Sequence, residues 1–183
     1  MQTLRVDLKR TPFMIRGLEQ NAGATLSIRG GSKAIRIGGI IDRIDYRSGA
    51  FEIIDYKTGT TEHSINSVAG LFEREAKKRN KAAFQTLVYG LIWDKMHPGS
   101  AGIFPGIYGL KKIFKEETTR LTNKEEGGND VNYLEIRDQF EPQLISLLEE
   151  IFNPEIPFKQ TSVEENCQYC NFASICGKQS VQS

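Results

Sequence analysis

The first third of the chain alternates short runs of β-branched and aromatic residues with turn residues. This pattern predicts strands separated by turns at 21–23 and 30–32, with the strands at residues 3–20, 24–30, 33–46 and 50–57. After a loop at 60–66, apolar residues recur at helical spacing and predict helices over 67–79 and 81–96. The rest of the chain predicts a strand at 103–110, a polar loop at 116–132 and an amphipathic helix at 137–152.

This order of elements predicts an α/β fold in which a mixed sheet is flanked by helices. The 183 residues suit a single domain. Its strands occupy 1–60, its helices and a further strand 61–157, and a cysteine-containing tail 158–183. No apolar run approaches the roughly 20 residues that a membrane span needs, so we expect no membrane partner. The odd number of cysteines, 3, and the absence of a signal-peptide pattern favour the reducing cytoplasm.

The candidate chemistry lies on the last two predicted strands, around a hairpin turn at residues 46–50. Side chains alternate along a strand, so Asp55 and Lys57 share one face, and the hairpin can bring Asp42 beside them. Two carboxylates suit a hard divalent cation such as magnesium, and they favour the charged form of the lysine. An ordinary surface ion pair is the alternative for an isolated D-x-K. Arg43 and Asp45 point to the opposite face from Asp42.

The strings G-x-x-D-R-x-D, ending at Asp45, and D-Y-K-T-G, starting at Asp55, extend this pattern. Together they resemble the PD-(D/E)xK nuclease superfamily, and most closely its RecB-like branch. The resemblance implies a restriction-endonuclease-like fold, with Asp42 and Asp55 as metal ligands and Lys57 as the catalytic lysine. It further implies that the backbone carbonyl of Tyr56 is a ligand, that the metal is Mg²⁺ or Mn²⁺, and that the substrate is DNA. For Arg43 and Asp45 it implies structural ion pairing rather than catalysis. Glu52 points away from Asp55 along the strand, and we expect it to be solvated.

A second match to the same family is the motif Q-x-x-x-Y at Gln85 and Tyr89, on the second predicted helix. Positions i and i+4 share a helix face, so both side chains can point at the metal site. The resemblance assigns them contacts with the substrate strand, whereas core packing of Tyr89 is the alternative. Basic residues precede this motif and are expected either to line a strand-binding groove or to form a solvated helix face: Arg74, Lys77, Lys78, Arg79 and Lys81.

The third match is the C-x2-C-x5-C ending at Cys167, Cys170 and Cys176. It resembles the iron–sulfur staple of AddB-type helicase–nuclease subunits, which implies a [4Fe–4S] cluster. A cubane cluster needs four ligands, and this chain has only three cysteines. The segment at residues 4–8 reads as a strand, whereas the family opens with a helix that carries a His or Glu. We therefore expect that the fourth cysteine and this helix belong to a longer parent; a vestigial site or free thiols are the alternatives.

The combined motifs predict a metal-dependent DNA exonuclease domain that acts at broken DNA ends in recombinational repair. Its expected partners are DNA and a helicase subunit or helicase portion of the parent. The net charge of only +1 gives this prediction no overall electrostatic support. A catalytically silent DNA-end-binding or scaffold module and a restriction-type endonuclease are the alternatives. The silent module is disfavoured because it has no obvious reason to keep two mutually repelling carboxylates.

Overall fold

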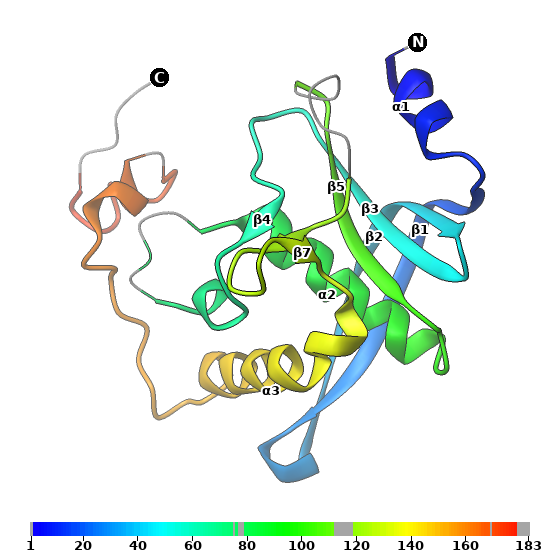
Figure 1. Cartoon of the computed structure of the whole chain (residues 1–183). Coiled ribbons are helices and arrows are strands. Elements are labelled where there is room, and N and C mark those ends of the chain that lie inside the picture. Colours follow the sequence, from blue (N-terminus) through cyan, green and yellow to red (C-terminus); the bar gives the residue numbers. More distant parts are fainter. Residues whose placement is uncertain (1, 75, 77–78, 112–118, 169, 179–183) are drawn as a thin grey trace.

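A mixed sheet forms the centre of the molecule in the computed structural model, which describes residues 2–74, 76, 79–111, 119–168 and 170–178. Its strand order is β1-β2-β3-β5, where the strands are β1 (Met14–Ile28), β2 (Lys33–Arg47), β3 (Ala50–Lys57) and β5 (Ile103–Gly109). The first two pairings are antiparallel and the pairing of β3 with β5 is parallel. The predicted α/β fold with a mixed sheet is therefore confirmed (Figure 1).

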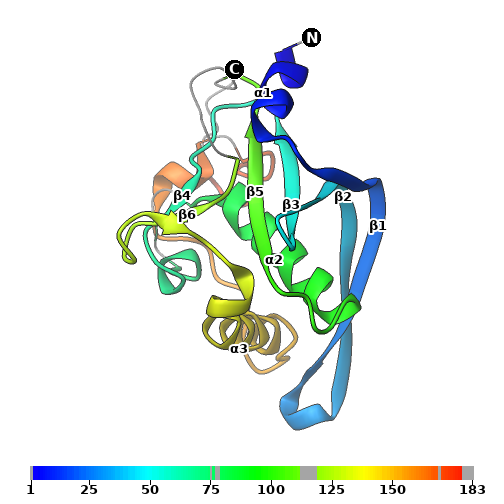
Figure 2. The same ribbon diagram turned by 45° about the vertical axis from the view of Figure 1, so that its right-hand side comes forward.

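Helices pack against both faces of this sheet (Figure 2). On one face α2 (Lys81–Met96) and α3 (Tyr133–Ile151) bury the main apolar core, which includes Ile53 of β3. On the other face α1 (Gln2–Arg10) buries Val6 against Ile54 of β3 and Tyr108 of β5. Neighbouring residues of β3 thus enter two different apolar clusters, as the alternation of side chains along a strand requires.

Asparagine side chains begin both long helices. Asn80 accepts a hydrogen bond from the Ala83 amide at the start of α2, and Asn132 accepts one from the Leu134 amide at the start of α3. Such caps satisfy backbone donors that have no partner inside the helix. The Asn80 side-chain amide also donates to the backbone oxygens of Glu62 and Ser64, at 2.8 and 3.0 Å. The start of α2 is therefore tied to the loop that follows β3.

A small second sheet lies beyond that loop. It has the order β4-β6-β7, with strands β4 (Ser64–Ile65), β6 (Thr122–Asn123) and β7 (Asn129–Asp130). The polar loop predicted at 116–132 thus contains two short strands, and its residues 116–118 lie outside the described part.

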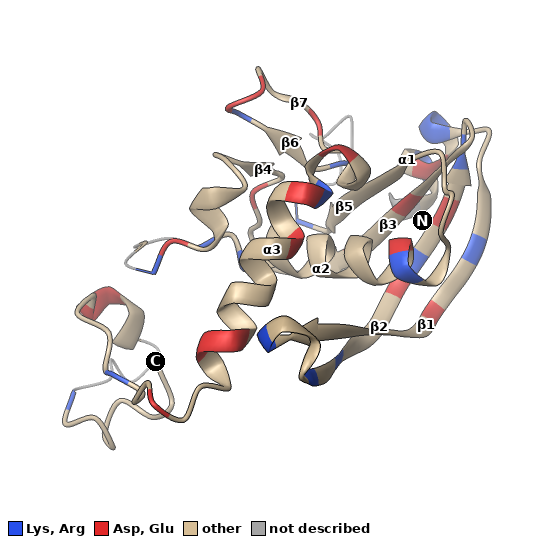
Figure 3. Cartoon of the chain, turned by 90° about the horizontal axis from the view of Figure 1, so that it is seen from below, with Lys and Arg blue, Asp and Glu red and all other residues tan. Residues whose placement is uncertain are grey.

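None of the described helices is both long and apolar enough to cross a lipid bilayer. Acidic residues follow one another along α3 (red in Figure 3).

Three of the predicted elements are wrong. The N-terminal segment, predicted to be a strand, is the helix α1, and the turn predicted at 21–23 is continuous strand because Gly23 pairs with Gly38 of β2. Of the helix predicted at 67–79, the described residues contain only a short 3₁₀ turn at Ala69–Leu71, and residues 75, 77 and 78 lie outside the described part. Lys77 and Lys78 of the predicted basic cluster lie outside the described residues.

The prediction that Glu52 is solvated is also wrong. Glu52 is 1% exposed and forms ion pairs with Arg10 of α1 and with Arg120, the latter at 2.7 Å. Burial alone would raise the pKa of Glu52, but the two guanidinium groups outweigh it and lower the pKa. Contacts with residues far away in the sequence therefore fix this carboxylate beneath the sheet.

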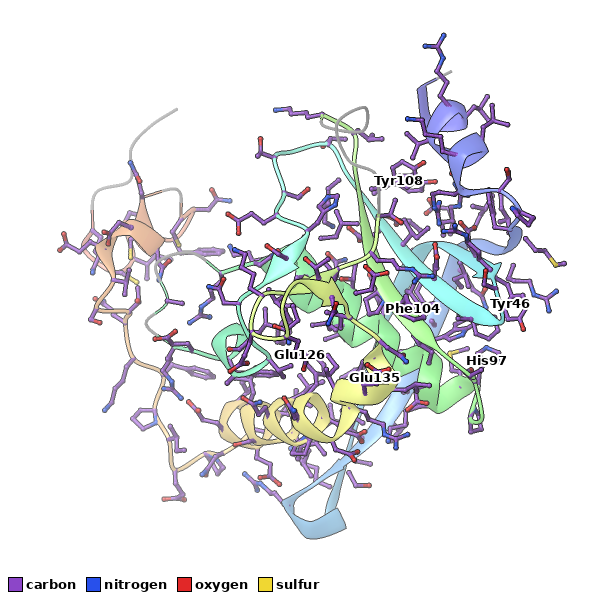
Figure 4. The ribbon with its side chains drawn as sticks, viewed as in Figure 1. Tyr46, His97, Phe104, Tyr108, Glu126 and Glu135 are labelled. Carbon is purple, nitrogen blue, oxygen red and sulfur yellow. The ribbon has the colours of Figure 1, made fainter. Side chains whose placement is uncertain are left out.

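The predicted pairing of Arg43 with Asp45 is confirmed, at 2.8 Å between Nε and Oδ1. Arg43 also contacts Asp7 of α1 at 2.8 Å, and the Tyr108 hydroxyl donates to the same carboxylate at 3.1 Å. Figure 4 shows Tyr108 beside α1. Buried charges are stable only when they are paired, so these contacts anchor α1 to the face of the sheet opposite α2.

Candidate active site

The hairpin of β2 and β3 sets the position of the two predicted acidic ligands. Its two-residue turn places Ser48 and Gly49 at φ angles of 51° and 85°, which suit the turn geometry of a tight hairpin. Beyond the turn, Arg43 pairs with Ile54. The next residues on the two strands are Asp42 and Asp55, and the Asp42 carboxylate lies close enough to raise the pKa of Asp55.

A backbone hydrogen bond orients Asp42. Its Oδ2 atom accepts from the amide of Tyr56 at 2.7 Å, across the end of the hairpin ladder. The N–H and C=O groups of one strand residue point to the same side of the strand. The carbonyl of Tyr56 therefore lies on the side of Asp42, while the next carbonyl, that of Lys57, accepts from Leu110 after β5 at 2.9 Å.

Asp55 is the buried member of the acidic pair, with an exposed fraction of 2%. Burial raises its pKa, and the neighbouring Asp42 charge raises it further, while Lys57 acts in the opposite direction. Lys57 Nζ lies 2.5 Å from Asp55 Oδ2. A cation at this point is therefore favourable, because it compensates two carboxylates that would otherwise repel each other.

A chain of polar contacts runs from Lys57 into α2. Lys57 Nζ donates to Gln85 Oε1 at 2.9 Å, and Gln85 Nε2 donates to the Tyr89 hydroxyl at 3.0 Å. Gln85 and Tyr89 are one helical turn apart, and both face the sheet from the same side of α2, in agreement with their i, i+4 spacing. Tyr89 is 8% exposed and belongs to the main core as well. Contacts of these two residues with a substrate strand stay a prediction.

Gly39 is a residue of this site that the sequence analysis did not single out. A Cβ atom built on Gly39 would lie 3.0 Å from the Tyr89 hydroxyl and 3.1 Å from its ring atom Cε1. The glycine thus leaves room for the Tyr89 ring above β2. Its place at the start of the G-x-x-D-R-x-D string was the available signal, because an interior strand glycine often marks a close approach by another group.

The donor set at the end of the hairpin consists of oxygen atoms from Asp42, Asp55 and the carbonyl of Tyr56. Oxygen ligands of this kind fit magnesium or manganese, which usually take one or two carboxylates and keep several waters. Among the residues that the structure describes, no three His, Cys, Asp or Glu side chains gather into a group that could hold a metal ion. The assignment of Asp42, Asp55 and the Tyr56 carbonyl as metal ligands therefore stays a prediction.

The predicted iron–sulfur ligands lie in the C-terminal tail. Cys167 and Cys170 are half-buried and Cys176 is exposed, and all three thiols are free. The Cys170 amide donates to the Cys167 carbonyl at 3.1 Å, next to a short 3₁₀ turn at Glu164–Cys167. As described, these cysteines do not form a metal-binding group. The iron–sulfur prediction stays a prediction.

The comparison with protein families agrees with the geometry of the hairpin and of α2. No curated protein matches the chain. The family model described as the PD-(D/E)XK nuclease superfamily matches residues 2–177. This match covers the sheet, the acidic pair, Lys57 and the Gln85–Tyr89 helix. The chain belongs to the PD-(D/E)XK nuclease superfamily.

Proposed function

We propose that the chain is a metal-dependent DNA nuclease domain whose reaction is the hydrolysis of phosphodiester bonds. The observation that carries the proposal is the convergence of Asp42, Asp55 and Lys57, with Lys57 held between Asp55 and Gln85. A lysine fixed from two sides beside paired carboxylates suits a reaction in which negative charge develops on a phosphate.

In this proposal Asp42, Asp55 and the carbonyl of Tyr56 hold Mg²⁺ or Mn²⁺. The bound cation supplies Lewis-acid polarisation of the phosphate and lowers the pKa of a coordinated water. Lys57 orients the attacking water and offsets charge on the phosphate oxygens. Gln85 keeps the lysine amine in place, and Tyr89 fixes the Gln85 amide. Each contribution depends on positioning, because misplacement by about 1 Å costs on the order of 100-fold in rate.

The finer assignment is that the domain acts as an exonuclease at broken DNA ends, within a helicase–nuclease that serves recombinational repair. It rests on the resemblance of the D-Y-K-T-G and Q-x-x-x-Y strings to the RecB-like branch. Three cysteines supply three of the four thiolates that a [4Fe–4S] cluster needs. No step of the hydrolysis is assigned to such a cluster.

The test is cleavage of end-labelled linear and closed circular DNA in the presence of magnesium or manganese. We expect the linear substrate to be degraded from its ends, and Lys57→Ala to lower the rate by several orders of magnitude with DNA binding retained. Lys95→Ala, on the far end of α2, is the matched control. Equal cleavage of circular DNA would favour an endonuclease, and binding without any cleavage would favour the silent module.

A further inference from the structure

A polar groove leads away from the catalytic lysine. It has a volume of about 770 Å³ and runs from Lys57 past the loop after β3 to Asn166 in the C-terminal segment. Hydroxyl groups of Thr60 and Thr61 line its beginning. Arg79 and Lys81, both exposed, line it at the start of α2. Threonine hydroxyls, arginine and lysine are groups that proteins commonly use to contact nucleic-acid phosphates.

A second cavity lies beside this groove. It has a volume of about 420 Å³ and lies between the chain that enters α2 and the exposed side of α3. Arg79 and Lys81 line both spaces, so the two are adjacent. The lining of the second cavity is largely apolar and includes Phe72, Phe84 and Leu147. The two phenylalanine rings are half-buried and meet edge to face, with their centroids 5.4 Å apart.

Cations exceed carboxylates in both spaces. The groove has Lys57, Arg79 and Lys81 against Glu62 and Glu73. The cavity has Arg74, Arg79 and Lys81 against Glu150, which is ion-paired with Arg74. An anionic chain is therefore favoured along both spaces, and the phenylalanine rings add a surface for a planar group in the cavity alone.

Resting on the nuclease function proposed above, we infer that the groove and the cavity together bind one unpaired DNA strand. The groove holds the phosphates next to the scissile position, and the cavity receives a base that stacks on Phe72 or Phe84. A base inside a duplex has both faces covered by its neighbours, so an aromatic cavity of this size selects unpaired nucleotides. Its volume lies within the range of about 300–1,000 Å³ that is typical of small-ligand pockets.

The inference is tested by binding in the presence of a metal chelator, so that cleavage plays no part. The probes are a fluorescent oligothymidylate of about 12 nucleotides, within the length range of single-strand sites, an abasic oligonucleotide of equal length, and a duplex. We expect the wild-type protein to bind the oligothymidylate about tenfold more tightly than either other probe, since stacking of one base accounts for a difference of this size. Equal affinity for all three probes, or no binding, overturns the inference.

Two variants separate the groove from the cavity. Arg79→Gln combined with Lys81→Gln should weaken binding of both single-stranded probes and reduce the slope of log affinity against log salt by about 0.7 for each lost phosphate contact. Lys95→Gln, on the same helix but paired with Glu141 at 2.7 Å, should change neither. Phe84→Leu keeps an apolar side chain and should weaken only the oligothymidylate complex, by about tenfold.

Unchanged salt dependence in the double variant, or an equal loss with both single-stranded probes in Phe84→Leu, overturns the inference. These outcomes are independent of the nuclease proposal. A protein that binds as described but cleaves no DNA with magnesium or manganese refutes the nuclease function and leaves the strand-binding site standing. A protein that cleaves DNA but shows none of these dependences refutes the strand-binding site and leaves the nuclease function standing.

Discussion

Lys57 of β3 donates a hydrogen bond of 2.9 Å to the side-chain oxygen of Gln85 on α2. The contact joins the strand that carries the acidic pair to the helix that carries the Q-x-x-x-Y motif. It holds the lysine amine from the helix side, while Asp55 holds it from the strand side at 2.5 Å. Two supports from different elements restrict the lysine more than either would alone.

Gln85→Leu should therefore lower the rate of DNA cleavage by about 10- to 100-fold with little change in DNA affinity, since the lysine loses one support and its amine is misplaced. Steady-state cleavage and equilibrium binding of the same DNA measure the two effects. Asp94→Asn on the same helix, where Asp94 pairs with Arg137 at 3.6 Å, is the control. An unchanged cleavage rate in Gln85→Leu would show that Asp55 alone suffices to hold the lysine.

Manganese should bind the wild-type protein, and Asp42→Asn or Asp55→Asn should each abolish measurable binding. Each substitution replaces one of the two proposed carboxylate ligands with a neutral amide, which removes half of the negative charge that would attract the cation. Isothermal titration calorimetry measures the affinity. Asp130→Asn, at a solvent-exposed carboxylate on β7, is the matched control. Equal manganese affinity in all variants would rule out the hairpin as the metal site.

Gly39→Ala should lower cleavage through Tyr89. The added methyl group would lie 3.0 Å from the Tyr89 hydroxyl, so the ring must shift and its contact with Gln85 weakens. Because both changes act on the same chain of contacts, Gly39→Ala and Gln85→Leu should be strongly non-additive in a double-mutant cycle of cleavage rates. Rate losses that simply multiply would contradict this link. Thermal unfolding of each variant checks that the fold is retained.

Glu52→Gln should destabilise the fold by about 3 kcal/mol at neutral pH, the cost of leaving buried guanidinium groups without a charged partner. The pKa of Glu52 is lowered in the folded state, so its contribution is fully present above the unfolded value of about 4.5. It is lost as the pH falls through the lower folded pKa. The difference in unfolding free energy between wild type and variant should therefore shrink below about pH 4. Denaturant titrations across this range measure it, and a difference that does not change with pH would contradict the role of the carboxylate charge.

The sequence predicts the hairpin, the acidic pair and the Gln85–Tyr89 face because each depends on a local rule. Alternation along strands places Asp55 and Lys57 together, and the helical repeat aligns Gln85 with Tyr89. The hairpin, the contact of Asp55 with Lys57 and the contact of Gln85 with Tyr89 are present in the structure. The roles of these residues in metal and substrate binding stay predictions.

The elements that the sequence analysis misses depend on distant partners. The helical state of residues 2–10 goes with the ion pairs of Arg10 to Asp45 and Glu52. The burial of Glu52 requires Arg120 as well, 68 positions further along the chain. Residues 67–79 have a helical pattern, but among their described residues only Ala69–Leu71 form a helical turn, and the next residue, Asn80, is bonded to the distant backbone of Glu62 and Ser64. No window of neighbouring residues contains such information.

The two faces of strand β3 contact different parts of the protein. Asp55 and Lys57 face α2 and the proposed chemistry, while Glu52 and Ile54 face α1 and its ion pairs. Inserting or deleting one residue in the turn at Ser48 and Gly49 would exchange the two faces throughout the strand. Asp55 would then meet the arginines behind the sheet, away from Asp42, and Glu52 would enter the apolar core. The length of a two-residue turn is therefore as strict a requirement for the proposed site as the identity of its side chains.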